Sequence, residues 1–153
     1  MSKTLALCNE RNIPVFGVCL GLQGIAEYCG GRLGTLAAPM HGKPSTITHR
    51  GGPLFEGLPE QINVGRYHSL HADYLPDCLR VMAQTDDGVV MAIEHRTLPM
   101  LAVQFHPESI MSQEENSGRT LVGNVVQYAL AIAQQRASTA QETQDDARHY
   151  AQF

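Results

Sequence analysis

Apolar residues recur along the chain first at helical and then at strand spacing, and glycine and proline mark the changes. Residues 3–11 have an apolar side and end in the polar segment NERN, which predicts a helix. Pro14 opens the continuous apolar run PVFGV, which is typical of a short strand buried on both faces. The segment LGLQGIAEYCGG has apolar residues at helical spacing and ends in two glycines, which predicts a second helix.

The middle of the chain, residues 32–105, has the pattern of a series of strands. Turn-forming segments separate short runs of β-branched and apolar residues, namely STITH, INVGRYHSLH, LRVMAQT, VVMAIEH and MLAVQFH. The segment RTLVGNVVQYALAIAQQRA then predicts a long amphipathic helix. Its expected inner face consists of Leu121, Val122, Val125, Val126, Ala129 and Leu130. We therefore expect a layered α/β domain over residues 1–136, followed by a polar, frayed or disordered tail over residues 137–153.

Composition narrows the class of protein. The 153 residues are 43% hydrophobic and 17% charged, with a net charge of −4, as expected of one globular domain. Basic residues do not cluster, so we expect no nucleic-acid or membrane partner. The first residues do not form a signal peptide, which predicts a cytoplasmic protein. The cysteines have no CxxC spacing and predict neither disulfides nor a zinc site: Cys8, Cys19, Cys29 and Cys78.

Cys19 lies in the segment GVCLG, which has the G-x-nucleophile-x-G spacing of a nucleophile elbow. A nucleophile at such a turn adopts a strained backbone, and side chains at Gly17 and Gly21 would collide with the strand or helix. We expect the following helix N-terminus to favour the thiolate, and the Leu20 N–H to stabilise an oxyanion. The motif alone is equally compatible with a structural cysteine in a βα turn.

A thiol nucleophile needs a base, and the segment AVQFHPES offers one. His106 ends an apolar strand, and Pro107 keeps the chain extended. Residues two apart then point the same way, so Glu108 can reach the imidazole and fix its tautomer. The alternative is a strand-end histidine beside a solvated glutamate. His68 and His71 are three apart on a strand and point to opposite faces, which disfavours a shared metal site.

The segments PVFGVCLGLQ and AVQFHPES together resemble the class I, or triad, glutamine amidotransferases over about residues 4–134. The segments PMHGKPS, GRYHSL and TDDGVVMAIEH are similar to amidotransferase components of anthranilate synthase, especially the version fused to the synthase. The resemblance implies a three-layer α/β fold with a mostly parallel sheet, helices on both faces and some antiparallel strands. It implies no cofactor and no metal.

The resemblance also implies roles for the triad. Cys19 would attack the side-chain amide of glutamine, His106 would carry the proton, and Glu108 would orient His106. The released ammonia would pass to a chorismate-using synthase subunit or domain that makes anthranilate for tryptophan biosynthesis. The loop PMHGKPS would lie beside the Cys19 turn, within the surface that this partner covers.

Substrate binding follows from the resemblance alone. Gln23 and the backbone of Ser69 and Leu70 would hold glutamine, and the Leu20 N–H would supply one oxyanion donor. Family members begin with a further half-domain, which contains a Gly-Pro-Gly loop that completes the oxyanion hole. These 153 residues contain no Gly-Pro-Gly. We therefore expect a partial domain, either a fragment or one completed by a partner, whose isolated activity is very low.

Two further interpretations remain open. The synthase could make aminodeoxychorismate or a phenazine precursor instead of anthranilate. Alternatively, the chain could be a non-catalytic fragment that only binds the synthase.

Overall fold

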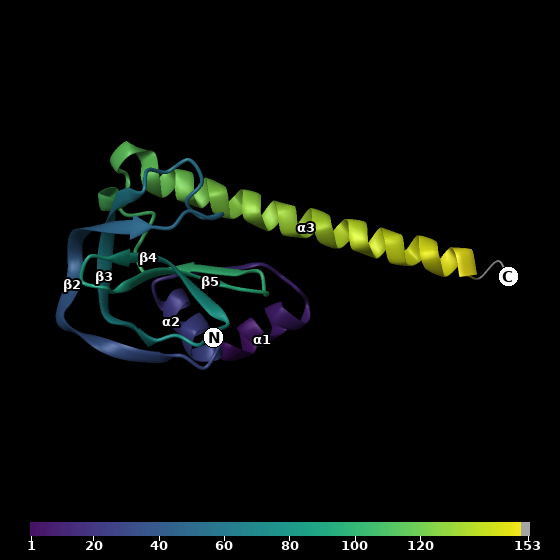
Figure 1. Ribbon diagram of the computed structural model, residues 1–153, viewed down its shortest axis with the longest axis horizontal. Helices are drawn as coiled ribbons and strands as arrows, with labels where there is room; N and C mark the ends of the chain where they lie inside the picture. Colours follow the sequence, from purple (N-terminus) through teal and green to yellow (C-terminus); the bar gives the residue numbers. More distant parts are fainter. Residues whose placement is uncertain (151–153) are drawn as a thin grey trace.

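The computed structural model describes the backbone of residues 1–150 and the side chains of residues 1–139. One sheet lies between two helical layers (Figure 1). Helices α1 (Ser2–Glu10) and α2 (Leu20–Tyr28) pack on one face, and α3 (Ser117–Tyr150) crosses the other face. The expected three-layer α/β architecture, with helices on both faces, is confirmed.

The sheet contains six strands in the order β1-β6-β5-β4-β2-β3. Their bounds are β1 Val15–Val18, β2 Arg32–His49, β3 Gln61–Tyr74, β4 Leu79–Thr85, β5 Val90–His95 and β6 Met100–Val103. Strands β1 and β6 are parallel, whereas all other pairs formed by the described residues are antiparallel. The expectation of a mostly parallel sheet is therefore wrong for this chain. Short connections join β4 to β5 and β5 to β6, and such connections reverse the chain.

Strand β1 lies at one edge of the sheet, where its pairing partner within residues 1–150 is β6. Only Gly17 of this strand is buried, and Val15, Phe16 and Val18 are half-buried. The apolar run predicted a strand buried on both faces, so the expected burial is only partly present. The β1–β6 register nevertheless places the end of β1 beside the end of β6, because Val18 pairs with Val103.

Strand β2 is much longer than the predicted strand STITH, because the chain is already extended from Arg32. It forms a ribbon with β3 that is interrupted by register shifts between Thr35 and Met40 and between His41 and Lys43. Gly42 adopts a φ of 63° at the second shift, a conformation that glycine tolerates best. The segment PMHGKPS is thus part of a bulged strand rather than a loop. Its exposed, irregular pattern lacks the alternation that identifies strands in sequence.

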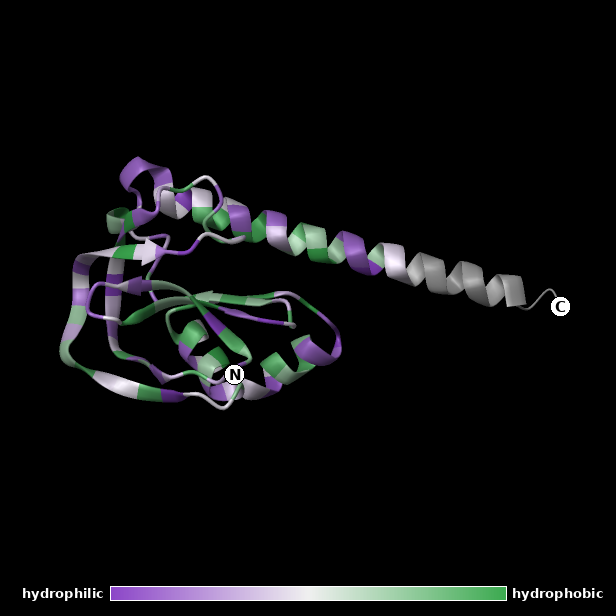
Figure 2. Ribbon diagram, in the orientation of Figure 1, coloured by the Kyte–Doolittle hydropathy of each residue, from purple (hydrophilic) through white to green (hydrophobic). Residues whose placement is uncertain are grey.

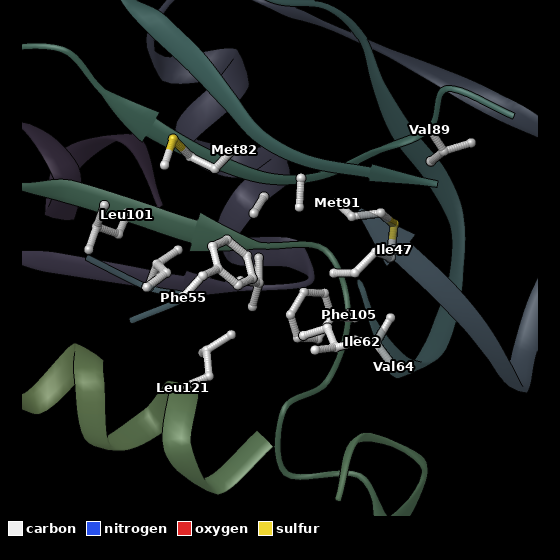
Figure 3. Packing of buried hydrophobic residues seen from close by; sticks show 14 residues of the cluster. Ile47, Phe55, Ile62, Val64, Met82, Val89, Met91, Leu101, Phe105 and Leu121 are labelled. Atoms are coloured by element: carbon white, nitrogen blue, oxygen red, sulfur yellow. The ribbon is translucent and has the colours of Figure 1, made fainter. Parts of the chain in front are cut away.

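The core between the sheet and α3 is built from large apolar side chains (Figure 3). Phe55, Phe105 and Leu121 are each at most 2% exposed, and each contributes roughly 1.5–3 kcal/mol through burial. A second cluster, which includes Leu22 and Ile25 of α2, fills the opposite side of the sheet. Packing in the two clusters fixes the position of the end of β1 relative to the start of α2.

Helix α3 differs from its prediction in two ways. Val122, Val126 and Leu130 were expected on the inner face but are 43%, 51% and 50% exposed. The sheet covers only a narrow stripe that contains Leu121 and Val125, so the apolar face in the sequence is wider than the contact (Figure 2). The helix also continues to Tyr150, beyond the end of the predicted helical segment. Residues 151–153 lie outside the described residues.

Within this described part, no helix combines the length and apolar character needed to cross a bilayer.

Candidate active site

Cys19 occupies the sharp turn between β1 and α2. Its backbone has φ 53° and ψ −99°, which is a strained conformation for a residue with a side chain. A Cβ at Gly17 would lie 2.6 Å from the carbonyl carbon of Gly21, so Gly17 is required for close packing of strand and helix. A Cβ at Gly21 would meet no atom within 4 Å. The predicted elbow is therefore present, but the expected steric requirement holds at Gly17 and is wrong at Gly21.

The helix N-terminus was expected to favour the thiolate form of Cys19, but the structure favours the protonated thiol. Burial raises the pKa of the thiol above its ordinary value of 9.0, and the charge of Glu108 acts in the same direction. Hydrogen bonds from the Leu20 backbone N–H and the Gln104 side chain lower the pKa but do not outweigh burial. The thiol is consequently protonated at neutral pH, so a base must remove its proton.

His106 carries the chemistry expected of that base. Its Nδ1 lies 2.6 Å from Oε1 of Glu108, so the predicted contact between these two side chains is present. A carboxylate only accepts hydrogen bonds, so Nδ1 carries the hydrogen and Nε2 keeps its lone pair. Tyr67 packs edge-on against the imidazole, with ring centroids 5.2 Å apart and planes at 81°. The ring is thus held from two sides in the tautomer that can accept a proton.

A buried serine fixes the backbone at the base. The Ser112 hydroxyl donates to the carbonyl of His106 at 2.7 Å and accepts from the N–H of Gly65 at 2.9 Å. The His106 N–H donates to the Gly65 carbonyl at 3.0 Å, which joins the loop to β3. Ser112 is 1% exposed. Sequence reasoning missed it because a single serine six residues after the base has no periodic or motif signal.

Every predicted site residue borders one pocket of about 650 Å³. The predicted members of its lining are Cys19, Leu20, Gln23, Ser69, Leu70, His106 and Glu108. The structure adds His41, Tyr67, His68 and Ser109, which sequence reasoning did not assign to a binding pocket. Two apolar side chains at this pocket, Leu20 and Leu70, are 66% and 40% exposed. The elbow, the base and the expected glutamine-binding residues therefore converge from separate parts of the chain.

Gln23 is 4% exposed, and its amide nitrogen is fully engaged within the protein. Its Nε2 donates to the carbonyl of Leu70 at 3.1 Å and to Oε1 of Gln104 at 3.2 Å. A side-chain amide has only two N–H donors, so a bound substrate could reach Gln23 only through the oxygen Oε1.

His68 fixes the same Leu70 carbonyl from the other side. Arg66 donates from Nε to His68 Nε2 at 3.0 Å, which places the imidazole hydrogen on Nδ1. This Nδ1–H group donates to the Leu70 carbonyl at 2.8 Å. Burial lowers the pKa of His68 and favours the neutral ring. His68 thus positions the backbone at Leu70, a role that its sequence context did not indicate.

Three further ligand-type side chains meet away from the pocket. They are Cys29, Cys78 and His95, and each places one potential ligand atom within 4.8 Å of the ligand atoms of the other two. Burial and the neighbouring Cys78 raise the pKa of Cys29 to about 11. His95 Nδ1 accepts hydrogen bonds from the N–H groups of Thr97 and Leu98, which puts the ring hydrogen on Nε2. Neither ring nitrogen then offers a free lone pair, so the cluster is poorly suited to a metal ion.

Known proteins are similar to this chain in sequence. An anthranilate synthase from Azospirillum brasilense is 59% identical over 123 residues, which cover 79% of this chain and 17% of that protein. An aminodeoxychorismate/anthranilate synthase component 2 from Bacillus subtilis is 47% identical over 117 residues, which cover 75% of this chain and 59% of that protein. The chain therefore spans less than two thirds of the length of either relative.

The fold has matches among solved structures. A GMP synthase component from Thermoplasma acidophilum superposes with a TM-score of 0.76 at 28% identity, covering 82% of this chain and 62% of that one. The family described as glutamine amidotransferase class-I matches residues 1–120, a range that includes the elbow, the histidine and the glutamate. The chain therefore belongs to the class I glutamine amidotransferase family.

Proposed function

We propose that this chain supplies the catalytic part of a glutamine amidotransferase, which releases ammonia from glutamine for a chorismate-using synthase. One observation carries the proposal. Cys19, on a strained strand-to-helix turn, shares a pocket with His106, whose Nδ1 is held by Glu108 at 2.6 Å. A nucleophile, a base and a group that orients the base are the elements of a thiol-dependent acyl transfer.

In the proposed reaction, His106 Nε2 takes the Cys19 proton while the sulfur attacks the amide carbon of glutamine. The C–N bond then breaks, the nitrogen leaves as ammonia with the proton from His106, and a γ-glutamyl thioester remains. Water attacks the thioester, His106 takes a proton from that water, and glutamate departs as the thiol re-forms. Glu108 stabilises the imidazolium in both steps. The high pKa of the resting thiol makes this proton transfer necessary.

Substrate binding is assigned to the pocket wall. The Leu20 N–H would face the developing oxyanion, because it follows the nucleophile at the helix start. Gln23 Oε1 and the backbone of Ser69 and Leu70 would hold the glutamine. The fixed Leu70 carbonyl and the engaged Gln23 nitrogen support a preformed binding wall.

The proposed partner is the synthase that makes anthranilate for tryptophan biosynthesis. The Azospirillum and Bacillus relatives support this choice through their names. A Streptomyces griseus relative at 49% identity is named aminodeoxychorismate synthase, so the aminodeoxychorismate partner is the second candidate. The product formed with each synthase from chorismate and glutamine distinguishes the two. A phenazine-type synthase is tested in the same way.

We place the reaction in the cytoplasm. All four cysteines are free thiols in the structure, which supports a reducing compartment.

The proposed nucleophile is tested by labelling. A glutamine analogue that alkylates thiols should modify Cys19 before the other cysteines, because only Cys19 lies in the pocket. Cys29 is a useful internal comparison, since its pKa of about 11 leaves it protonated at neutral pH. The measurement is peptide mapping after short exposure near pH 7.5, with excess glutamine as a competitor.

Cys19→Ser is the control, and it should abolish labelling of this peptide without increasing it elsewhere. Equal labelling of all four cysteines, unaffected by glutamine, would contradict the proposed nucleophile. A chain that binds the synthase but never labels at Cys19 would instead support the non-catalytic alternative.

The partner surface is tested at the β2 segment PMHGKPS. His41 borders the pocket, and Lys43 is exposed two residues further along β2. Lys43→Glu should weaken synthase binding by roughly three- to tenfold, because charge at an interface rim mainly affects association. Lys3→Glu on α1 is the matched control. Affinity measured by calorimetry should fall for Lys43→Glu alone, and unchanged affinity would remove this segment from the interface.

A further inference from the structure

Gln104 is a fully buried polar residue beside the nucleophile. It follows β6, is 0% exposed, and lies between the apolar residues Val103 and Phe105 in sequence. Burying an amide is unfavourable unless its donors and acceptor find partners. Gln104 Nε2 lies 3.6 Å from Cys19 Sγ, and its Oε1 accepts from Gln23 Nε2 at 3.2 Å. The side-chain partners of Gln104 are therefore the proposed nucleophile, Cys19, and a proposed glutamine-binding residue, Gln23.

The hydrogen bonds determine which end of the Gln104 amide faces the sulfur. The Leu70 carbonyl can only accept, so the group of Gln23 that faces it is the NH₂ group. The same NH₂ group donates to Gln104, whose oxygen must therefore face Gln23. The Gln104 NH₂ group is thus directed at Cys19 and acts as a donor to sulfur.

We propose that Gln104 is a positioning residue that holds the Cys19 sulfur and stabilises its thiolate as the proton leaves for His106. This role rests on the proposed function, because it concerns the nucleophile assigned there. A donor 3.6 Å from the sulfur strengthens its bond when the sulfur becomes negative. The hydrogen bond from Gln104 opposes the burial that raises the pKa of Cys19.

The same contacts connect substrate binding with the nucleophile. Leu70, Gln23, Gln104 and Cys19 form a continuous chain of hydrogen bonds from β3 to the elbow. Glutamine held against Leu70 and Gln23 would therefore bind to the same network that orients the sulfur.

The test measures the titration of Cys19 rather than glutamine turnover. Iodoacetamide alkylation of Cys19 is followed by peptide mapping between pH 7 and 10.5, and the midpoint reports the thiol pKa. The titratable groups around the pocket are His106 and Glu108 after β6, His68 on β3 and His41 on β2. These groups are identical in every variant compared, so a shift of the midpoint is due to the substituted residue.

Gln104→Leu keeps the side chain's approximate size and removes the donor. We expect its midpoint to rise by about one pH unit, with alkylation at pH 8 about tenfold slower. Gln104→Glu replaces the donor with a carboxylate and should raise the midpoint further. Gln127→Glu, at an exposed position on α3, is the matched control and should leave the midpoint unchanged.

Gln23→Leu provides an independent variant if Gln104→Leu unfolds, as judged by circular dichroism. It leaves the Gln104 amide without its orienting donor, so the Cys19 midpoint should rise by a smaller amount. Folded Gln104→Leu or Gln23→Leu with the wild-type midpoint would overturn the proposal. Absence of glutaminase activity even when the chain is fused behind an upstream family half that carries a Gly-Pro-Gly loop would contradict the proposed function but would leave this titration interpretable.

Discussion

Glutamine turnover by the 153-residue chain alone should be about 10²–10³-fold slower than turnover by the same chain fused behind an upstream family half that carries a Gly-Pro-Gly loop. An oxyanion hole needs two converging donors, and loss of one costs on the order of 10²–10³ in rate. The Leu20 N–H is the donor that the elbow supplies, and these residues contain no Gly-Pro-Gly. The 66% exposure of Leu20 and the empty space beside Gly21 support an incomplete wall.

The comparison uses glutamate release by three proteins: the chain, the fusion, and the fusion with Cys19→Ser. The Cys19→Ser fusion controls for activity that does not use the proposed nucleophile. Equal turnover by the chain and the fusion would show that another segment supplies the second donor. Binding of a labelled glutamine analogue, measured in parallel, separates weaker binding from slower chemistry.

Replacement of the base should have an effect of comparable size. His106→Asn in the fusion protein should lower glutamine turnover by about 10²–10⁴-fold, because a positioned general base contributes that factor. The pH dependence should change as well. Burial raises the pKa of the Cys19 thiol above its ordinary value, and the thiolate fraction rises with pH. Without His106, residual activity should therefore keep increasing above pH 9, because the thiolate then forms only by its own titration.

Two variants sharpen this prediction. Glu108→Gln keeps the size of the side chain but can also donate to the ring, so the wrong tautomer becomes accessible, and turnover should fall less than in His106→Asn. His71→Asn is the matched control, because His71 is on β3 but is not part of the pocket lining. A His106→Asn fusion with full turnover at pH 7 would remove His106 from the triad.

The parts of the site that sequence could predict are local. The elbow requires only five consecutive residues, and the histidine–glutamate contact joins side chains two positions apart. Both features are present, but the extended chain expected at Pro107 is not, because residues 107 and 108 form a turn in which the Ser109 N–H donates to the His106 carbonyl at 3.0 Å. The helices α1 and α2 were predicted because a single periodic face identifies each of them.

The parts that sequence could not predict depend on distant contacts. The hydrogen bonds of Gln104 and His68 form because the segment after β6 and strand β3 both meet α2, and neither residue lies in a pattern that indicates this meeting. The raised pKa of Cys19 likewise follows from burial, which the helix-terminus argument does not include. The burial of Val122, Val126 and Leu130 on α3 was mispredicted, because the hydropathy pattern of a helix does not indicate how much of its apolar face the sheet covers.

The buried hydroxyl of Ser112 has a consequence for how this protein can vary. It joins the His106 carbonyl to the Gly65 N–H, so the loop from residue 106 to residue 112 is closed onto β3 at both ends. An insertion or deletion inside that loop would change the distance between the base and the strand that carries Ser69 and Leu70. The number of residues between His106 and Ser112 is therefore constrained as strictly as the identity of those two residues, although surface loops generally accept insertions.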